Sequence, residues 1–195
     1  MNNVAPDNPS EILATLNSEL TCPVPLVLYG RAAICLGFDG AGPEHQATQD
    51  VDAILRCGQL EEFEADKEFW YAIERTNCRL ELRGLYITHL FPEASVFLRP
   101  DWGRHIVSVS RPPTRCLKLF RPHTVDLILT KMMRGDDPQD MDDVAFLVRH
   151  DGITRERMEP AFATVRMPDG VEFRDAFARA LPVVRGIFEN EGRRE

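Results

Sequence analysis

The short apolar runs with the composition of β-strands all lie before residue 122, and the segments after it carry apolar residues at helical spacing. A chain that separates strands from helices in this way is typical of the α+β class, here with a helical C-terminal half. The length of 195 residues fits one domain, or one domain with a small appendage. We therefore predict an α/β core over residues 1–122 and a helical region over residues 123–195, packed on that core.

Prolines, glycines and capping residues suggest where the individual elements begin. Ser10, Thr124 and Asp137 are expected to cap helices, and Pro138 suits the first helical position after Asp137. The expected strands cover residues 26–29, 48–56, 84–91, 94–98 and 104–110, and residues 115–120 form a further short apolar piece. The expected helices cover residues 10–20, 31–38, 60–82, 124–135, 137–150, 154–165 and 171–189.

Charge and cysteine content narrow the class of protein. The net charge of −8 gives no overall basic field, so a nucleic-acid partner would need a local basic patch. The five cysteines are odd in number and have no CxxC spacing, which favours a reducing compartment and buried thiols over disulfides. No signal peptide and no apolar run of about 20 residues is visible, so we expect a cytoplasmic protein outside the membrane.

Two aspartates open the second expected strand, in the stretch "ATQDVDAIL" at residues 47–55. In a strand, residues i and i+2 point to the same face, about 6.5–7 Å apart along the backbone. Asp50 and Asp52 should therefore project together, with Val51 turned into the core. A divalent cation between two such carboxylates removes their repulsion, and Mg²⁺ completes its shell with water and phosphate oxygens. The alternative is a pair of solvated acids that protects an edge strand.

The stretch "LVLYG" upstream supports the metal hypothesis. An apolar strand ends at Gly30 and leads into a short helix. The first backbone N–H groups of a helix form a natural phosphate cradle, and Arg31 adds positive charge. A plain strand-to-helix turn would give the same pattern.

These stretches resemble a known family. "LVLYGRAAICLGF" followed by "TQDVDAIL" resembles the signature of the nucleotidyltransferase superfamily. "DLILTKMMRGDDPQDMDDVAFLV" is similar to the downstream motif of the AbiEii/MenT-like group, in which a helix with a lysine precedes a D-x-x-D helix. The resemblance spans roughly residues 10–150 and implies a nucleotidyltransferase-like mixed sheet flanked by helices.

The resemblance also implies roles for individual residues. Gly30 and Arg31 would bind the triphosphate, and Asp50 and Asp52 would be catalytic ligands of Mg²⁺ or Mn²⁺. Lys131 would be a catalytic, phosphate-binding residue, and Asp140 would be a supporting or catalytic acid. A third carboxylate, common in the superfamily, has Glu81, Glu93 and Asp101 as candidates, and none stands out.

The implied function is transfer of a nucleoside monophosphate from a nucleoside triphosphate to a hydroxyl of RNA or protein. The same resemblance suggests a toxin–antitoxin or defence component, with an antitoxin as a further partner. One alternative is a nucleotide-binding module of the same fold without transferase activity. Another is a structural partner protein whose acids serve solubility alone.

Simpler explanations exist for several of these residues. Lys131 could lie on a solvated helix face, or pair with Asp126 on its own helix. Asp140 could serve only the N-terminus of its helix. Trp102 and Arg104 could stack on a base, although a buried core tryptophan is the simpler expectation.

Overall fold

The structure is a computed structural model that describes residues 7–191. The chain divides into two compact units. Within the described residues, the first unit contains residues 7–92 and 106–121, and the second contains residues 93–105 and 122–191. The sequence placed a boundary near residue 122. The second unit begins again at Pro122, and it also includes a segment that interrupts the first unit.

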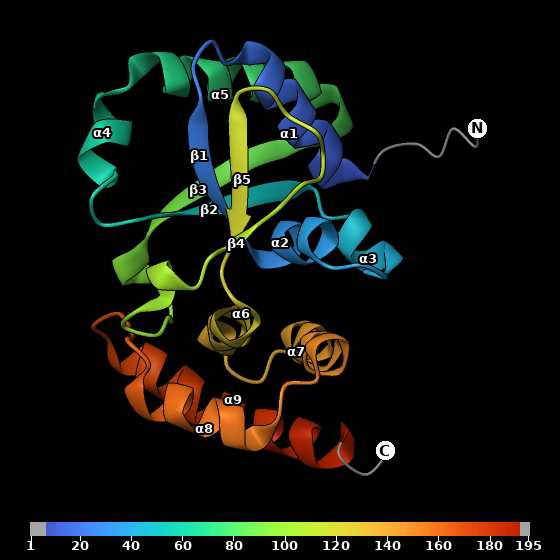
Figure 1. The fold of residues 1–195 in the computed structure, drawn as a ribbon, viewed down its shortest axis with the longest axis vertical. Helices are drawn as coiled ribbons and strands as arrows, with labels where there is room; N and C mark the ends of the chain where they lie inside the picture. The colour runs from blue at the N-terminus through green and yellow to red at the C-terminus, as the bar shows by residue number, and fades with distance from the viewer. Residues whose placement is uncertain (1–6, 192–195) are drawn as a thin grey trace. The chain divides into compact units, whose positions relative to one another are not determined.

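The first unit is built on a mixed sheet, so the α+β class is confirmed (Figure 1). Its strand order is β3-β2-β1-β5-β4. β1 pairs antiparallel with β2 and parallel with β5, while β2–β3 is parallel and β4–β5 is antiparallel. The strands are β1 (Val24–Tyr29), β2 (Asp50–Leu55), β3 (Tyr86–Pro92), β4 (Val107–Ser108) and β5 (Leu117–Arg121).

Helices flank this sheet. α1 and α5 contact each other, and they also contact β2 and β3, respectively. The side chain of Asn77 on α5 locks the helix to β3, because it accepts from the Ile87 backbone N–H at 2.8 Å and donates to the Ile87 carbonyl at 3.0 Å. The helices of this unit are α1 (Asn8–Glu19), α2 (Gly30–Gly37), α3 (Pro43–Gln46), α4 (Leu60–Ala65) and α5 (Lys67–Leu80), followed by the 3₁₀ turn η1 (Glu81–Arg83).

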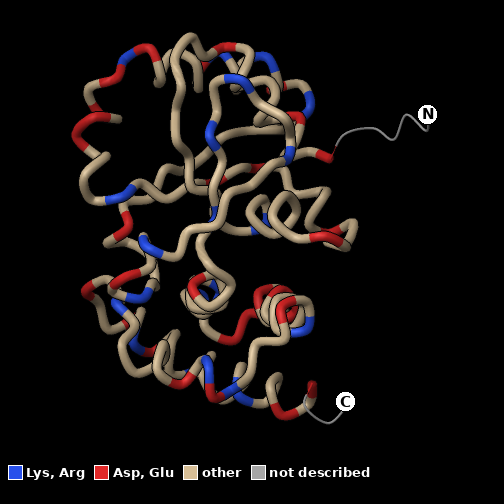
Figure 2. Tube along the Cα trace, viewed as in Figure 1, with Lys and Arg blue, Asp and Glu red and all other residues tan. Residues whose placement is uncertain are grey.

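The second unit is helical. α6 (Thr124–Lys131) is buried along its whole length and contacts α7 (Pro138–Asp151). α8 (Arg155–Thr164) and α9 (Val171–Glu191) complete the expected C-terminal helices. Acidic residues gather along α7 (Figure 2). The unit also contains the 3₁₀ turns η2 (Glu93–Ser95), η3 (Trp102–Arg104) and η4 (Met132–Arg134).

Several expected boundaries are wrong. The strand expected at 94–98 is the turn η2 followed by a single bridge between Leu98 and Arg166. The strand expected at 104–110 shrinks to β4, because β5 pairs with only its centre. The helix expected at 60–82 breaks at Asp66, whose side chain caps α5 through the Phe69 N–H.

Two of the three expected caps are also wrong. Asp7, rather than Ser10, caps α1, and it accepts from the Ser10 N–H at 2.8 Å. His123 replaces Thr124 as the cap of α6, since its Nδ1 accepts from the Val125 N–H. The cap at Asp137 is confirmed, with Pro138 at the first turn of α7.

The cysteines are all free thiols, but the expectation that all are buried is wrong. Cys35 and Cys116 are buried, whereas Cys22, Cys57 and Cys78 are exposed. Burial raises the pKa of the Cys35 thiol to about 12. Within residues 7–191, no helix combines the length and apolar composition needed to cross a bilayer.

Candidate functional site

Asp50 and Asp52 lie on one face of β2, as their spacing predicts. Both are half-buried, and Val51 between them is fully buried on the opposite face. The Asp52 side chain is 21% exposed. Two carboxylates therefore share a partly desolvated patch of the sheet, where a charge is less well screened than in water.

Each carboxylate is held by a threonine hydroxyl. Thr48 donates to Asp50 Oδ1 at 2.9 Å from the segment just before β2. Thr88 donates to Asp52 Oδ1 at 2.7 Å from the neighbouring strand β3. These bonds fix the direction of both carboxylates and leave the remaining lone pairs for other partners. Neither threonine is among the site residues predicted from the sequence.

A β-bulge brings a second residue of β3 to Asp52. The register between β2 and β3 shifts between Val51 and Ala53, which pair with Ile87 and Leu90. Two residues of β3, Thr88 and His89, therefore oppose the single residue Asp52. His89 Nδ1 lies 3.6 Å from Asp52 Oδ1, which is ion-pair range and longer than a hydrogen bond.

The electrostatics of Asp52 follow from this setting. Burial is the main cause that raises the pKa of the Asp52 carboxyl, and the charge of Asp50 raises it further. The Thr88 hydrogen bond and His89 partly oppose that shift. The ionised form of Asp52 is thus destabilised in the folded protein, and a nearby cation would stabilise it.

Gly30 begins α2 beside this pair. Tyr29, the residue before Gly30, is the direct register partner of Asp52 in the β1–β2 ladder. Gly30 has φ of +62°, a left-handed conformation that side chains rarely adopt, although a Cβ there would meet no atom within 4 Å. The backbone path, rather than crowding, therefore requires glycine at the turn.

The start of α2 can accommodate an anion. Tyr29 is the N-cap residue, and its side chain makes no capping hydrogen bond. The first N–H groups of a helix attract phosphate through hydrogen bonds and the helix dipole. Arg31, the second residue of α2, is half-buried. The predicted neighbourhood of Gly30 and Arg31 with Asp52 is therefore consistent with the strand register.

The donor chemistry of the aspartates suits a hard cation. Carboxylate oxygens are preferred ligands of Mg²⁺, which commonly takes one or two of them and fills its shell with water and phosphate oxygens. Within residues 7–191, no group of three or more His, Cys, Asp and Glu side chains could hold a metal. The pair fits a cation that arrives with a phosphate ligand, but it does not fit a closed all-protein site.

Lys131, Asp140 and Asp143 come together in the second unit. The Lys131 ammonium lies 3.0 Å from Asp140 Oδ1 and 2.6 Å from Asp143 Oδ2. Arg134 Nε reaches the other oxygen of Asp140 at 2.6 Å. All three charged groups of the lysine–aspartate cluster are buried, so the lysine and the D-x-x-D pair of the sequence motif form one ionic unit.

Two simpler explanations for Lys131 are wrong. A solvated helix face is excluded because Lys131 is only 7% exposed. Pairing with Asp126 fails because five positions separate the two residues, and five positions turn their side chains apart on a helix. Asp126 instead holds Arg99, with oxygens 2.7 Å from Nη2 and 3.1 Å from Nε. Asp140 likewise does more than serve a helix end, because it binds two cations.

Among residues 7–191, none of the three candidates for a third catalytic carboxylate is placed with Asp50 and Asp52 in a group that could hold a metal. Glu93 accepts from the Trp102 indole at 3.2 Å, and Asp101 lies 3.0 Å from His105 Nε2. Glu81 is an exposed residue of η1. Trp102 is 2% exposed, as expected for a core tryptophan, so its ring is not available for stacking.

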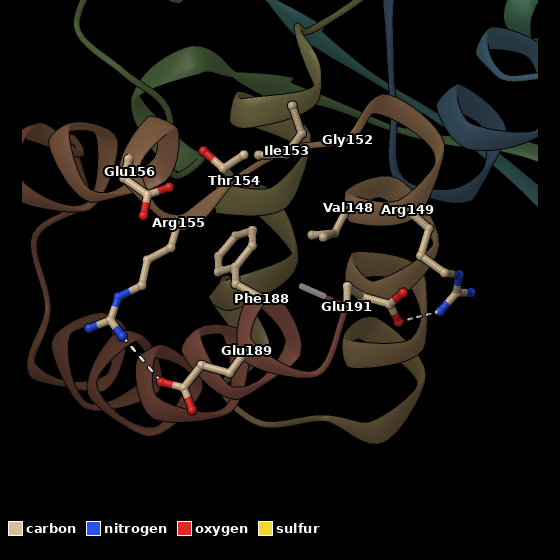
Figure 3. A pocket seen from close by; sticks show the side chains of 10 residues that line it. All are labelled: Val148, Arg149, Gly152, Ile153, Thr154, Arg155, Glu156, Phe188, Glu189 and Glu191. Atoms are coloured by element: carbon tan, nitrogen blue, oxygen red, sulfur yellow. Dashed lines mark hydrogen bonds and ion pairs between the residues drawn. The ribbon is translucent and has the colours of Figure 1, made fainter. Parts of the chain in front are cut away.

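A separate cavity of about 460 Å³ lies in the helical unit, and Figure 3 shows its lining. Val148 and Phe188 supply buried apolar surface. Two ion pairs lie in its lining, one between Arg149 and Glu191 and one between Arg155 and Glu189, each with an N–O distance of 3.2 Å. Its arginines are thus already neutralised, and none of the predicted site residues lines it.

Comparison of the chain with protein-family models, with curated proteins and with solved structures finds no significant match.

Proposed function

We propose that this protein binds a nucleoside triphosphate with Mg²⁺ or Mn²⁺ at Asp50 and Asp52 and transfers the nucleoside monophosphate to a hydroxyl of RNA or protein. The observation that carries the proposal is the register of β1 with β2. Tyr29 pairs with Asp52, and the Gly30 turn follows Tyr29 directly. Asp52 in turn shares a face of β2 with Asp50. A carboxylate pair beside a helix start combines a cation site with a phosphate site.

The reaction is a displacement at the α-phosphorus. The acceptor hydroxyl oxygen forms a bond to that phosphorus, and the bond from phosphorus to the oxygen that bridges to the β-phosphate breaks. Pyrophosphate leaves, and the hydroxyl proton passes to solvent. A bound divalent cation would neutralise charge that develops on the phosphate oxygens.

The chain's own residues orient the reactants. Thr48 and Thr88 hold the two carboxylates in place, which lowers the cost of assembling the site when the nucleotide arrives. The N–H groups at Gly30 and the guanidinium of Arg31 would hold the departing phosphates. The resemblance implies phosphate binding for Lys131 and a supporting role for Asp140, but both lie in the second unit and are paired with each other, so the proposed site does not use them. A toxin–antitoxin or defence role, also implied by the resemblance, stays part of the proposal.

A nucleotide-binding module without transfer is the second candidate. The observation that favours it is the position of Glu93 and Asp101, which are engaged with Trp102 and His105. A site with two carboxylates can still bind a metal–nucleotide complex. It has less negative charge than a site with three, however, so it activates the acceptor hydroxyl less strongly.

The test uses nucleoside triphosphates labelled at the α-phosphate, with Mg²⁺, and offers transfer RNA and the protein itself as acceptors. The matched variants are Asp50→Asn, Asp52→Asn and, as a control, Asp39→Asn, whose side chain is 98% exposed. Transfer by the parent and the control, but not by the first two variants, supports the enzyme. Binding without transfer supports the module. A parent that gains no thermal stability from millimolar Mg²⁺–triphosphate contradicts both.

A further inference from the structure

A short stack of rings adjoins Asp52. The His89 ring lies over Phe91 with centroids 5.2 Å apart and planes 21° apart. Phe91 in turn contacts Tyr29 edge-on, with centroids 5.5 Å apart. These are ordinary geometries for favourable aromatic pairs. The β-bulge that turns His89 toward Asp52 also sets its ring on this stack, so its plane is fixed on one side by a neighbour.

The other side of the His89 ring faces outward. Its side chain is 66% exposed, whereas Phe91 beneath it is half-buried. An exposed, flat ring that is held by stacking offers a π-face at little cost in side-chain entropy. In a regular strand, the residue after Thr88 would point to the opposite face of the sheet from Asp52. The bulge therefore places the His89 ring on the Asp52 face, and we call its exposed surface the platform.

We infer that the base of the bound nucleoside triphosphate stacks on the outer face of His89, extending the column of His89 and Phe91. The inference rests on the proposed function and deepens it, because it assigns the nucleobase subsite. His89 Nδ1 lies 3.6 Å from Asp52 Oδ1, so the ring adjoins the proposed site for the metal-bound phosphates. In a nucleotide, a single sugar joins the α-phosphate to the base, which matches two adjoining subsites of this kind.

The platform sets an expectation for base preference. Stacking uses the π-face that every base has, so it discriminates weakly among bases. His89 lies 3.6 Å from Asp52 and stacks on Phe91, and neither contact reads the edge of a base. The four triphosphates should therefore bind with similar affinity, with purines favoured modestly by their larger rings.

The experiment separates a ring from a charge at this position. His89→Phe keeps a ring without a charge, His89→Lys keeps a charge without a ring, and His89→Ala keeps neither. Tyr71→Ala is the matched control, because Tyr71 is an aromatic residue on α5 whose side chain is half exposed. Calorimetric titrations measure binding of Mg²⁺–ATP, Mg²⁺–CTP and Mg²⁺–tripolyphosphate, the last of which lacks a base. Melting curves verify that each variant folds.

The expected result is a roughly tenfold or greater loss of ATP affinity in His89→Ala and His89→Lys. His89→Phe and Tyr71→Ala should stay near the parent, and tripolyphosphate should bind all five proteins alike. Equal ATP affinity in parent and His89→Ala overturns the inference and leaves the proposed function intact.

Other outcomes also overturn it. Retained affinity in His89→Lys with lost affinity in His89→Phe assigns His89 a charge role instead. Weaker binding of a single-stranded RNA oligonucleotide by His89→Ala, with unchanged ATP binding, assigns the platform to an acceptor. If the parent binds neither ATP nor tripolyphosphate with Mg²⁺, the proposed function and the inference fail together.

Discussion

The Lys131 ammonium lies 2.6 Å from the Asp143 carboxylate, and both side chains are buried. Asp140 shares the same ammonium at 3.0 Å and has a second cation in Arg134. Lys131 thus serves two buried carboxylates at once. Buried charges of this kind are costly to leave without a counter-charge.

Lys131→Ala should lower the free energy of unfolding by about 3–5 kcal/mol, because it leaves buried carboxylates without their ammonium. Chemical denaturation measures this. Lys67→Ala, which removes an exposed lysine at the start of α5, should change stability by less than about 0.5 kcal/mol. An unchanged stability in Lys131→Ala would contradict the buried cluster.

A double variant tests the origin of that loss. Lys131→Met with Asp143→Leu replaces the ion pair by apolar groups and leaves Asp140 bound to Arg134. Apolar replacement of a buried pair is often close to neutral, so the double variant should recover much of the stability lost in the single one. A double variant less stable than Lys131→Ala would show that the loss is a packing effect.

Asp52→Asn should become more stable than the parent as the pH rises in metal-free buffer. Burial raises the pKa of the Asp52 carboxyl above that of the unfolded chain, so its contribution to stability is fully present at low pH. That contribution is lost as the pH rises through the folded-state pKa. The two proteins should therefore converge in acid and diverge toward neutrality, in denaturation curves recorded across this range with a chelator present.

Thr88→Val provides the matched variant for this pH dependence. It removes the hydrogen bond that lowers the Asp52 pKa, so the loss of stability should move to higher pH. Identical pH profiles in the parent and Asp52→Asn would refute a strained carboxylate.

Asn17→Ala should destabilise the first unit by about 1–3 kcal/mol. The Asn17 Oδ1 accepts from the backbone N–H groups of Arg115, Cys116 and Leu117, at 3.0, 2.8 and 3.2 Å. Alanine leaves these donors at the start of β5 without that acceptor. Asn17→Asp keeps an acceptor oxygen and should retain most of the stability, as urea denaturation would show. Equal losses in both variants would point to helix packing instead.

Gly37→Ala should cost about 1–3 kcal/mol through overpacking. A Cβ at Gly37 would lie 2.4 Å from Cδ of Arg121, whose guanidinium sits 3.9 Å from the centre of the Phe38 ring and is buried. Gly58→Ala is the control, because a Cβ there meets no atom within 4 Å. Thermal melts should show a lowered Tm for the first variant only.

The local sequence pattern determined many of the helices and strands and, in the candidate site, the placement of Asp50, Asp52 and Gly30. The period of two residues set Asp50 and Asp52 on one face, and the apolar run before Gly30 determined the strand and turn, because both depend on nearest neighbours along the chain. The cap at Asp137 is local in the same way. The strand expected at 94–98 failed because a strand needs a partner, and Leu98 finds only one bridge.

Tertiary structure alone decided which side chains meet. The bulge that turns His89 to Asp52 depends on how β3 is paired with β2, and no spacing within β3 encodes it. Lys131 is nine residues from Asp140 and twelve from Asp143, so only the packing of α6 against α7 brings their charges together. Because these side chains are buried, their pairing is required for stability: a charge inside the protein needs a counter-charge, whereas a charge in water does not.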